Sequence, residues 1–139
     1  MASETKSGQS GITITSQTGE KIVLTSTNTK ITFDTFAENV RNKSKSVNAT
    51  VTITGKIKDT DTSELKKVFN WSKSFKSAEV YRKLAIDDTA GTDEIRRSYE
   101  FDQMFVLGYE EYLDEDDVNS KYTLTLRQKE DHFDDIKTY

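Results

Sequence analysis

The chain has 139 residues, about the length of one domain, and 33% of them are hydrophobic while 32% are charged. This balance predicts a thin core, as in a small barrel or sandwich with a large wetted surface. The absence of Cys excludes disulfides, thiolate metal sites and a cysteine nucleophile. No apolar stretch approaches the roughly 20 residues of a membrane span, and the N-terminal residues lack the apolar run of a signal peptide. Synthesis and initial residence in the cytoplasm are therefore expected.

The net charge of −4 argues against nucleic acid as the main partner. The charge is unevenly distributed along the chain. Residues 1–62 hold eight Lys or Arg and six Asp or Glu, whereas the remaining residues hold 12 and 18. Two interpretations stay open. The simpler one is two ordinary solvated faces, and the other is that the basic part of one copy pairs with the acidic part of another.

Residues 1–11 are polar and have no periodicity, so they predict an arm that becomes ordered only against a neighbour. From Ile12 onward the signal is β, with short β-branched runs at 12–14, 21–25 and 30–33 separated by turn-forming residues. The clearest strand covers 47–57. Its alternation predicts a buried face of Val47, Ala49, Val51, Ile53 and Ile57 and a wet face of Asn48, Thr50, Thr52, Thr54 and Lys56.

A helix is predicted next, with Asp61 as its N-cap and Glu64 at the spacing of a capping box. The apolar side of this helix is predicted to carry Leu65, Val68, Phe69 and Ser72. Trp71 lies off that stripe. We interpret it as a packing residue at the edge of the core, with a ligand platform as the alternative.

The remainder again predicts strands. Residues 78–86 and 94–101 flank a hairpin loop at 87–93, and the apolar run 104–107 predicts a strand covered on both faces. Gly108 predicts a bulge or a close backbone approach. After an acidic loop at 114–117, the final strand places Tyr122, Leu124, Leu126 and Gln128 on one face and Lys121, Thr123, Thr125, Arg127 and Lys129 on the other.

No pattern in the sequence predicts catalysis, a cofactor or a metal. There is no phosphate-binding glycine loop, and the single histidine, His132, excludes a multi-histidine metal site within one chain. Asp131, Asp134 and Asp135 surround His132 as they would a general base, but a charged tail offers no water-excluding pocket, which favours a solvated histidine. The loop 114–117 lacks the ligand spacing, glycine and bidentate glutamate of a calcium loop, which favours a solvated hairpin loop.

The C-terminal part resembles a known family. Tyr99-Glu100-Phe101-Asp102-Gln103-Met104-Phe105-Val106-Leu107-Gly108-Tyr109-Glu110-Glu111-Tyr112, the acidic loop and then Tyr122-Thr123-Leu124-Thr125-Leu126-Arg127-Gln128-Lys129 are similar to the end of the haemolysin-coregulated proteins of type VI secretion and the related phage tail tube proteins. The order of strands, long alternating strand and helix is also similar, so the resemblance covers about residues 47–131. Met104 departs from it, because a small residue is usual there, and Gly108 interrupts the strand.

The resemblance implies a mainly β (α+β) fold, a small antiparallel β-barrel or sandwich with one flanking helix. It also implies a single domain at 12–131 between the arm and a charged tail at 132–139. The function implied is a structural, non-enzymatic subunit of the inner tube of a phage tail or contractile injection system, which assembles into stacked rings, usually of six copies. The expected partners are other copies of the chain, sheath and baseplate or spike proteins and cargo in the lumen, without cofactor or membrane insertion. The expected location is a virion tail or an injection particle.

Two alternatives remain. A subunit of the baseplate that initiates the tube would resemble the same family. A monomeric β-sandwich that binds carbohydrate or acts as an adaptor would need a platform of exposed aromatic rings, for which the candidates are Tyr81, Tyr99, Tyr109, Tyr112 and Tyr122. Most of these tyrosines occupy alternating strand positions, where packing into the core is the simpler expectation.

Overall fold

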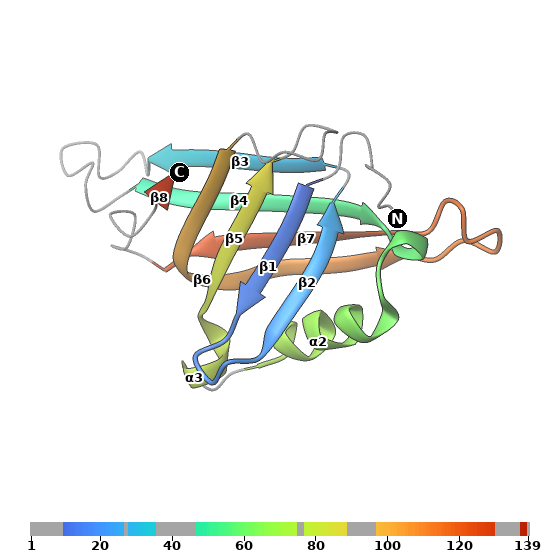
Figure 1. Ribbon diagram of the computed structural model, residues 1–139, viewed down its shortest axis with the longest axis horizontal. Coiled ribbons are helices and arrows are strands. Elements are labelled where there is room, and N and C mark those ends of the chain that lie inside the picture. Colours follow the sequence, from blue (N-terminus) through green and yellow to red (C-terminus); the bar gives the residue numbers. More distant parts are fainter. Residues whose placement is uncertain are drawn as a thin grey trace.

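The computed structural model describes residues 10–26, 28–35, 47–74, 77–88, 97–129 and 137–138. Within these residues the strands form one strongly curved antiparallel sheet in the order β2-β1-β5-β6-β7-β4-β3, and β8 pairs with β6 (Figure 1). The mainly β fold with one flanking helix is confirmed. The strands are β1 Ser10–Thr15, β2 Lys21–Ser26, β3 Asn28–Thr35, β4 Val47–Lys56, β5 Arg82–Asp88, β6 Arg97–Tyr112, β7 Lys121–Gln128 and β8 Lys137–Thr138. The helical segments are η2 Ile57–Asp59, α2 Thr62–Ser72 and α3 Ser77–Val80.

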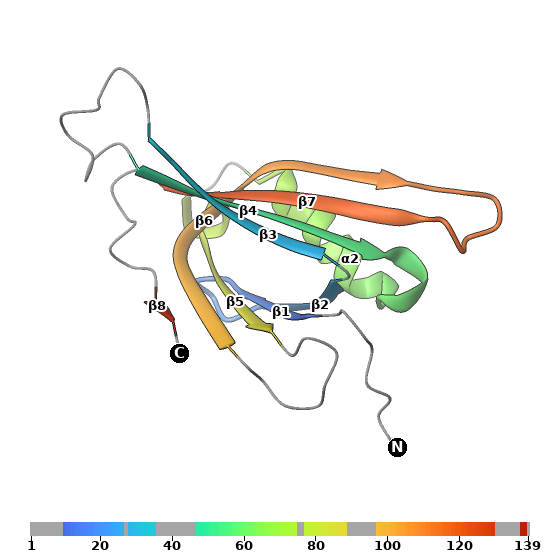
Figure 2. The same cartoon turned by 90° about the horizontal axis from the view of Figure 1, so that it is seen from above.

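The sheet folds over into two layers because β6 belongs to both (Figure 2). Its first half pairs with β5 as far as Met104, and its second half, from Met104 onward, pairs with β7. Gln103, with a φ of 60°, lies at the bend between the halves. The end of β7 fastens this bend: the buried Gln128 amide donates to the Asp102 carbonyl at 3.0 Å, and the Lys129 amide donates to the Gln103 carbonyl at 2.7 Å.

The core lies between the two layers, and the alternation seen in the sequence determines which side chains enter it. Val51 and Ile53 are fully buried, while Thr50, Thr52 and Thr54 face outward at intermediate exposure. The same holds for β7, whose buried face is the predicted one. The predicted buried face is therefore confirmed for β7 and for Ala49, Val51 and Ile53 of β4. Ile57 lies in η2 and is only partly buried, and the side chains of Val47 and Asn48 lie outside the described part of the structure. The buried hydrophobic residues are Ile12, Ile14, Ile22, Leu24, Ala49, Val51, Ile53, Leu65, Val68, Trp71, Leu84, Ile86, Phe101, Met104, Tyr122, Leu124 and Leu126.

Helix α2 covers the side of the core below the sheet in Figure 1. Asp61 caps it as predicted, since its carboxylate accepts from the Ser63 amide at 2.9 Å. The apolar face differs from the prediction. Trp71 is 2% exposed and completes a stripe with Leu65 and Val68, whereas Phe69 is 47% exposed and Ser72 faces solvent. The interpretation of Trp71 as a packing residue holds, but the helix is rotated so that Phe69 leaves the core.

The layers approach each other closely where β2 meets β4. Tyr122 on β7 passes beneath Gly55 and donates from its hydroxyl to the Thr25 carbonyl at 2.9 Å. A Cβ at position 55 would lie 2.6 Å from that carbonyl oxygen and 2.7 Å from the Tyr122 ring. Only glycine fits there, because real Cβ atoms do not approach other atoms so closely.

Two further expectations change. The segment predicted as a strand from 78 begins as the short helix α3, and β5 starts only at Arg82. The run 104–107 is not covered on both faces: Met104 is buried, but Leu107 is 49% exposed. The bulge predicted at Gly108 is confirmed, since the register with β7 shifts between Val106 and Gly108. Residues 1–9, most of the loop 87–93 and His132 with Asp131, Asp134 and Asp135 lie outside the described residues.

Candidate assembly surfaces

The layer formed by β6, β7, β4 and β3 has a strand edge without a strand partner on each side, among the described residues. On one side, β3 pairs only with β4. On the opposite side of the layer lies β6. Its residues 105–112 pair with β7 along one edge, whereas the second edge has no described partner because β5 does not extend beyond Met104. Both edges are eight residues long. Unpaired edges of this length are templates for pairing with another chain.

The directions of these two edges are opposite. Successive neighbours β6, β7, β4 and β3 are antiparallel, so in a layer of four strands the first and the last run in opposite directions. A second copy related by rotation about an axis along the strands would therefore bring its β3 antiparallel to β6 of the first, with the same face of both layers turned to the axis. This contact is heterologous, because two different edges meet, and such contacts close into rings or continue as helices.

The outward face of this layer is rich in threonine, and we call it the threonine face. Thr52 lies opposite Thr125 and Thr54 opposite Thr123, so hydroxyl side chains form cross-strand pairs at the centre of the face. Among the residues of this face whose side chains are described, five are charged and four of these are basic: Lys30, Lys56, Lys121, Arg127 and Glu110. The Arg127 guanidinium also contacts the Thr50 hydroxyl at 3.4 Å. This face is polar, uncovered by helix and weakly basic.

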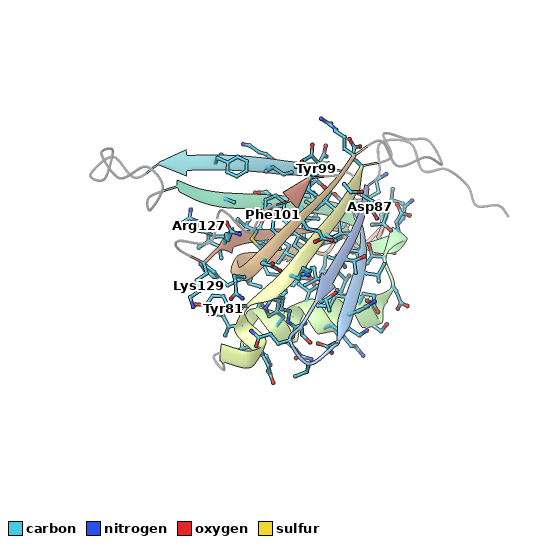
Figure 3. All side chains as sticks on the ribbon, turned by 60° about the vertical axis from the view of Figure 1, so that its left-hand side comes forward. Tyr81, Asp87, Tyr99, Phe101, Arg127 and Lys129 are labelled. Carbon is cyan, nitrogen blue, oxygen red and sulfur yellow. The ribbon has the colours of Figure 1, made fainter. Side chains whose placement is uncertain are left out.

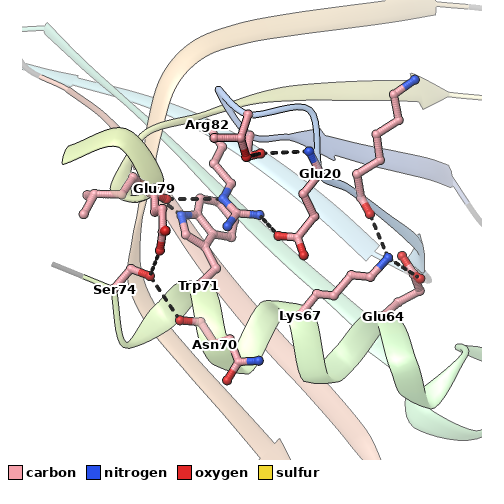
Figure 4. A network of polar contacts seen from close by, with 12 residues as sticks. Glu20, Glu64, Lys67, Asn70, Trp71, Ser74, Glu79 and Arg82 are labelled. Carbon is pink, nitrogen blue, oxygen red and sulfur yellow. Dashed lines mark hydrogen bonds and ion pairs between the residues drawn. The ribbon is translucent and has the colours of Figure 1, made fainter. Parts of the chain in front are cut away.

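The edge of β2 at the other end of the sheet is protected, in contrast. Glu64 on α2 accepts a 2.7 Å hydrogen bond from the Val23 amide, and Lys67 donates to the Lys21 carbonyl at 3.1 Å. The two α2 side chains are joined by a 3.1 Å ion pair (Figure 4). Glu64 is thus not the capping-box residue that its spacing predicted. It occupies backbone groups of β2 and so discourages pairing at that edge.

A polar network next to this edge anchors α2 to the sheet (Figure 4). Arg82 is buried, lies 5.1 Å from the Trp71 ring and forms a 3.0 Å ion pair with Glu20. The Trp71 indole in turn donates to the Val80 carbonyl at 2.9 Å. These contacts satisfy the indole N–H and stack it under a cation, which is the role of a packing residue and not of a ligand platform.

The candidate tyrosines do not form a platform. Tyr122 is buried, and Tyr99 and Tyr109 pack against the core. The ring of Tyr81 meets that of Phe105 edge-on, with 6.1 Å between the centroids, and the Nζ of Lys129 lies 5.0 Å from the centroid of the Tyr81 ring. Figure 3 shows Tyr81 and Lys129 close together. Tyr112 is 57% exposed, on the threonine face. Burial raises the pKa of Tyr122 to about 12, and burial together with a hydrogen bond to Glu111 raises the pKa of Tyr109.

An apolar groove of about 480 Å³ runs between α2 and the start of the β6–β7 loop. Its walls include Phe69, the residue that left the predicted helix face, and Leu113, which is 72% exposed. Neither was predicted as a surface residue, and the sequence offers one signal for Leu113: an apolar residue directly before an acidic loop. The loop 114–117 itself is a solvated hairpin loop, as expected.

The described residues contain no group of three or more His, Asp or Glu side chains placed to hold a metal ion. None of the helices within the described ranges is long and apolar enough to span a membrane. The described surface offers the strand edges, the threonine face and the apolar groove as candidate features.

No protein-family model and no curated sequence matches the chain. Solved structures do match. Hcp1 from Flavobacterium johnsoniae is 10% identical with a TM-score of 0.54, covering 92% of this chain and 94% of that one. A chain of the PVC sheath-tube complex, an extracellular contractile injection system in its extended state, is 15% identical with a TM-score of 0.57, covering 98% and 91%. A chain of the anti-feeding prophage baseplate, 6-fold symmetrised, is 11% identical with a TM-score of 0.54, covering 100% and 97%.

The curved sheet, its flanking helix and these matches define the class: the chain has an Hcp-like tail tube fold. More particularly, its structural neighbours are Hcp proteins and tube, tube-cap and baseplate components of contractile injection systems. These neighbours are structural proteins, and the family resemblance read from residues 47–131 agrees with them.

Proposed function

We propose that the chain is a non-catalytic structural subunit of the inner tube of a contractile injection system or phage tail. The single observation that carries the proposal is the pair of unpaired, oppositely directed edges on one four-stranded layer, β3 and residues 105–112 of β6. Pairing β3 of each copy with β6 of the next completes the hydrogen bonding of both edges and closes a ring. Six copies per ring is the number that the family resemblance implies.

In such a ring the threonine face lines the lumen. The hydroxyl pairs at the centre of this wall offer a passing cargo little apolar surface to bind, whereas the rings of Phe105 and Tyr112 lie along its β6 side. The second layer and α2 then face outward, where sheath proteins would surround the tube, while baseplate or spike proteins would meet its end. Rings that stack produce a hollow conduit, located in the assembled particle.

Cysteine cross-linking tests the ring directly, because the chain has no Cys of its own. Lys30→Cys on β3 is combined in turn with Phe105→Cys, Gly108→Cys or Glu110→Cys on β6. All four positions lie on the threonine face, and a Cβ at Gly108 would have no atom within 4 Å. Oxidation of the cysteine pair that is in register should give a series of covalently linked oligomers on a gel. The largest of them should contain as many copies as the ring.

The controls are the single-cysteine variants, which can give dimers at most. Absence of this series of oligomers, together with a native mass of 15.9 kDa at every concentration, would favour the monomeric binding module instead. Rings that never stack in electron micrographs would indicate a subunit of the baseplate or cap, which matches the fold equally well.

We further propose that the chain is a single domain and that residues 1–9, ahead of β1, serve assembly. The predicted limits of 12 and 131 change, because Ser10 and Gly11 belong to β1 and Lys137–Thr138 form β8. Deleting residues 1–9 should leave the thermal melt of the monomer nearly unchanged and reduce the number of tubes in negative stain. A truncated protein that assembles normally would make this segment dispensable, and one that fails to fold would make it part of the domain.

A further inference from the structure

The threonine face ends in a pocket of about 490 Å³ where β4 stops and β7 begins. It is lined by Asn28, Lys56, Tyr112, Asn119, Ser120 and Lys121. Ser120 holds the shape of the pocket, because its hydroxyl accepts a 2.8 Å hydrogen bond from the Asp114 amide and its own carbonyl accepts from the Ile57 amide at 3.0 Å. The pocket is therefore a formed feature at the strand ends.

Two lysines face each other across this pocket. Lys56 and Lys121 are direct cross-strand neighbours, and like charges in that position destabilise a sheet. Among the described residues neither ammonium group has a carboxylate within 4.0 Å, and Lys121 instead lies 5.8 Å from the Tyr112 ring. Two exposed, opposed cations without an acidic partner in the described part of the chain are suited to binding an anionic group.

The opposite end of the same layer leads into an acidic segment. The chain leaves β7 at Gln128 and returns in β8 at Lys137. In Figure 1 both points lie at the left, whereas β4 ends and β7 begins at the right. The residues between Gln128 and Lys137 include Glu130, Asp131, Asp134 and Asp135. When rings stack head to tail, the pocket at one end of the layer in one ring faces the opposite end of the layer in the next ring. That opposite end is where β7 leads into the acidic segment.

We infer that the Lys56–Lys121 pocket binds carboxylates of residues 130–135 from a copy in the adjacent ring, and that this contact sets the polarity of stacking. The inference rests on the proposed tube function. It explains why a repulsive lysine pair is present at strand ends: the repulsion is relieved only when a second copy supplies the counter-charge.

A nucleic acid cargo fits the pocket less well. Phosphate chains bind along continuous stripes of cations, whereas these two lysines are confined to one pocket at the strand ends. The centre of the threonine face next to them consists of hydroxyl pairs, and the loop 114–117, which precedes β7, is acidic. We therefore favour a polypeptide carboxylate from another copy.

The test compares ring formation with tube length. Lys56→Gln with Lys121→Gln removes both charges and should shorten tubes several-fold in negative stain, while native mass spectrometry still finds intact rings. Because it also removes a repulsion, this variant should melt no lower than the unchanged protein. Lys56→Glu with Lys121→Glu should abolish stacking, and adding Asp131→Lys with Asp134→Lys to it should restore tubes. Lys66→Glu, an exposed position on α2, is the matched control and should stack normally.

Salt concentration provides an independent test of the same contact. At 1 M salt the Debye length falls to about 3 Å, so tubes of the unchanged protein should shorten while rings persist. Normal tubes from the Gln or Glu double variants would overturn the inference and leave the proposed function standing. Normal tubes that had lost the ability to retain poly-glutamate or single-stranded DNA would assign the pocket to cargo instead. An unchanged protein that forms no rings would overturn the proposed function, and the inference with it.

Discussion

The hydroxyl of Tyr122 on β7 donates a 2.9 Å hydrogen bond to the backbone carbonyl of Thr25 on β2, 97 residues away in sequence. This bond joins the two layers at a place where the described strands do not pair with each other, since β2 pairs only with β1. Tyr122 is fully buried, so its ring packs in the core while its hydroxyl links the two layers.

Tyr122→Phe keeps the ring and removes the bond. We expect a loss of roughly 0.5–1.5 kcal/mol in the free energy of unfolding, the usual net contribution of one hydrogen bond. Urea titration measures it. Tyr112→Phe, at the exposed end of β6, is the control and should change nothing; equal losses in both variants would contradict the role of the Thr25 contact.

The same residue predicts an alkaline limit of stability. Burial raises the pKa of Tyr122 to about 12 from an ordinary value of 10.0, so the folded state favours the neutral phenol. The stability linked to this group is complete below pH 10 and is lost as the pH rises toward 12, with a span of roughly 2–3 kcal/mol. The free energy of unfolding, measured from pH 8 to pH 12, should therefore fall more steeply for the unchanged protein than for Tyr122→Phe. Parallel curves would contradict the shift.

Glu64→Ala should expose the edge of β2, because the Val23 amide loses its acceptor. We expect a loss of roughly 1–3 kcal/mol, typical of a hydrogen bond to a charged group, and an increase in irregular aggregates measured by light scattering. Glu64→Gln retains an acceptor oxygen and should behave much more mildly. Lys66→Ala, next to these residues but exposed, controls for general effects on the helix.

Gly55→Ala should be strongly destabilising, because the new Cβ would lie 2.6 Å from the Thr25 carbonyl oxygen. Overpacking of this kind costs roughly 1–3 kcal/mol. Gly108→Ala is the matched control, since no atom lies within 4 Å of its added Cβ. Thermal melts compare the two, and a neutral effect at position 55 would show that the layers separate easily.

The two faces of β4 can be separated by one substitution on each. Val51→Asp places a charge in the closed core and should prevent folding, because a buried unpaired carboxylate costs several kcal/mol. Thr52→Asp places the same group on the outward face and should fold with a normal circular dichroism spectrum. Similar melting temperatures for the two variants would mean that the faces are reversed.

Strict alternation made β4 and β7 predictable from sequence, since a period of two leaves one choice of buried face. Gly108 was predictable as a bulge for a similar reason: an isolated glycine in a strand signals an irregularity. The helix was harder. The sequence pattern placed Phe69 on the apolar face of α2 and left Trp71 off it. The contacts that select Trp71 instead, with the Val80 carbonyl and Arg82, come from outside the helix.

The assembly surfaces depend on long-range neighbours that the sequence pattern does not contain. Glu64 has the spacing of a capping box, but its partner is the Val23 amide, 41 residues away. Likewise, the opposition of Lys56 and Lys121 follows from the register of β4 with β7, and the unpaired half of β6 follows from where β5 ends. The charge asymmetry left self-pairing as one of two interpretations and gave no position for it.

In the ring proposed above, the number of strands in the β6-β7-β4-β3 layer has a consequence for ring size. Because each copy contributes an even number of alternating strands, every seam is antiparallel whatever the number of copies, and strand direction never forbids closure. The copy number is then decided by the angle at which β3 of one copy meets β6 of the next. Bore diameter thus becomes a property of a single seam, and side chains along residues 105–112 could widen or narrow the channel while the subunit itself stays unchanged.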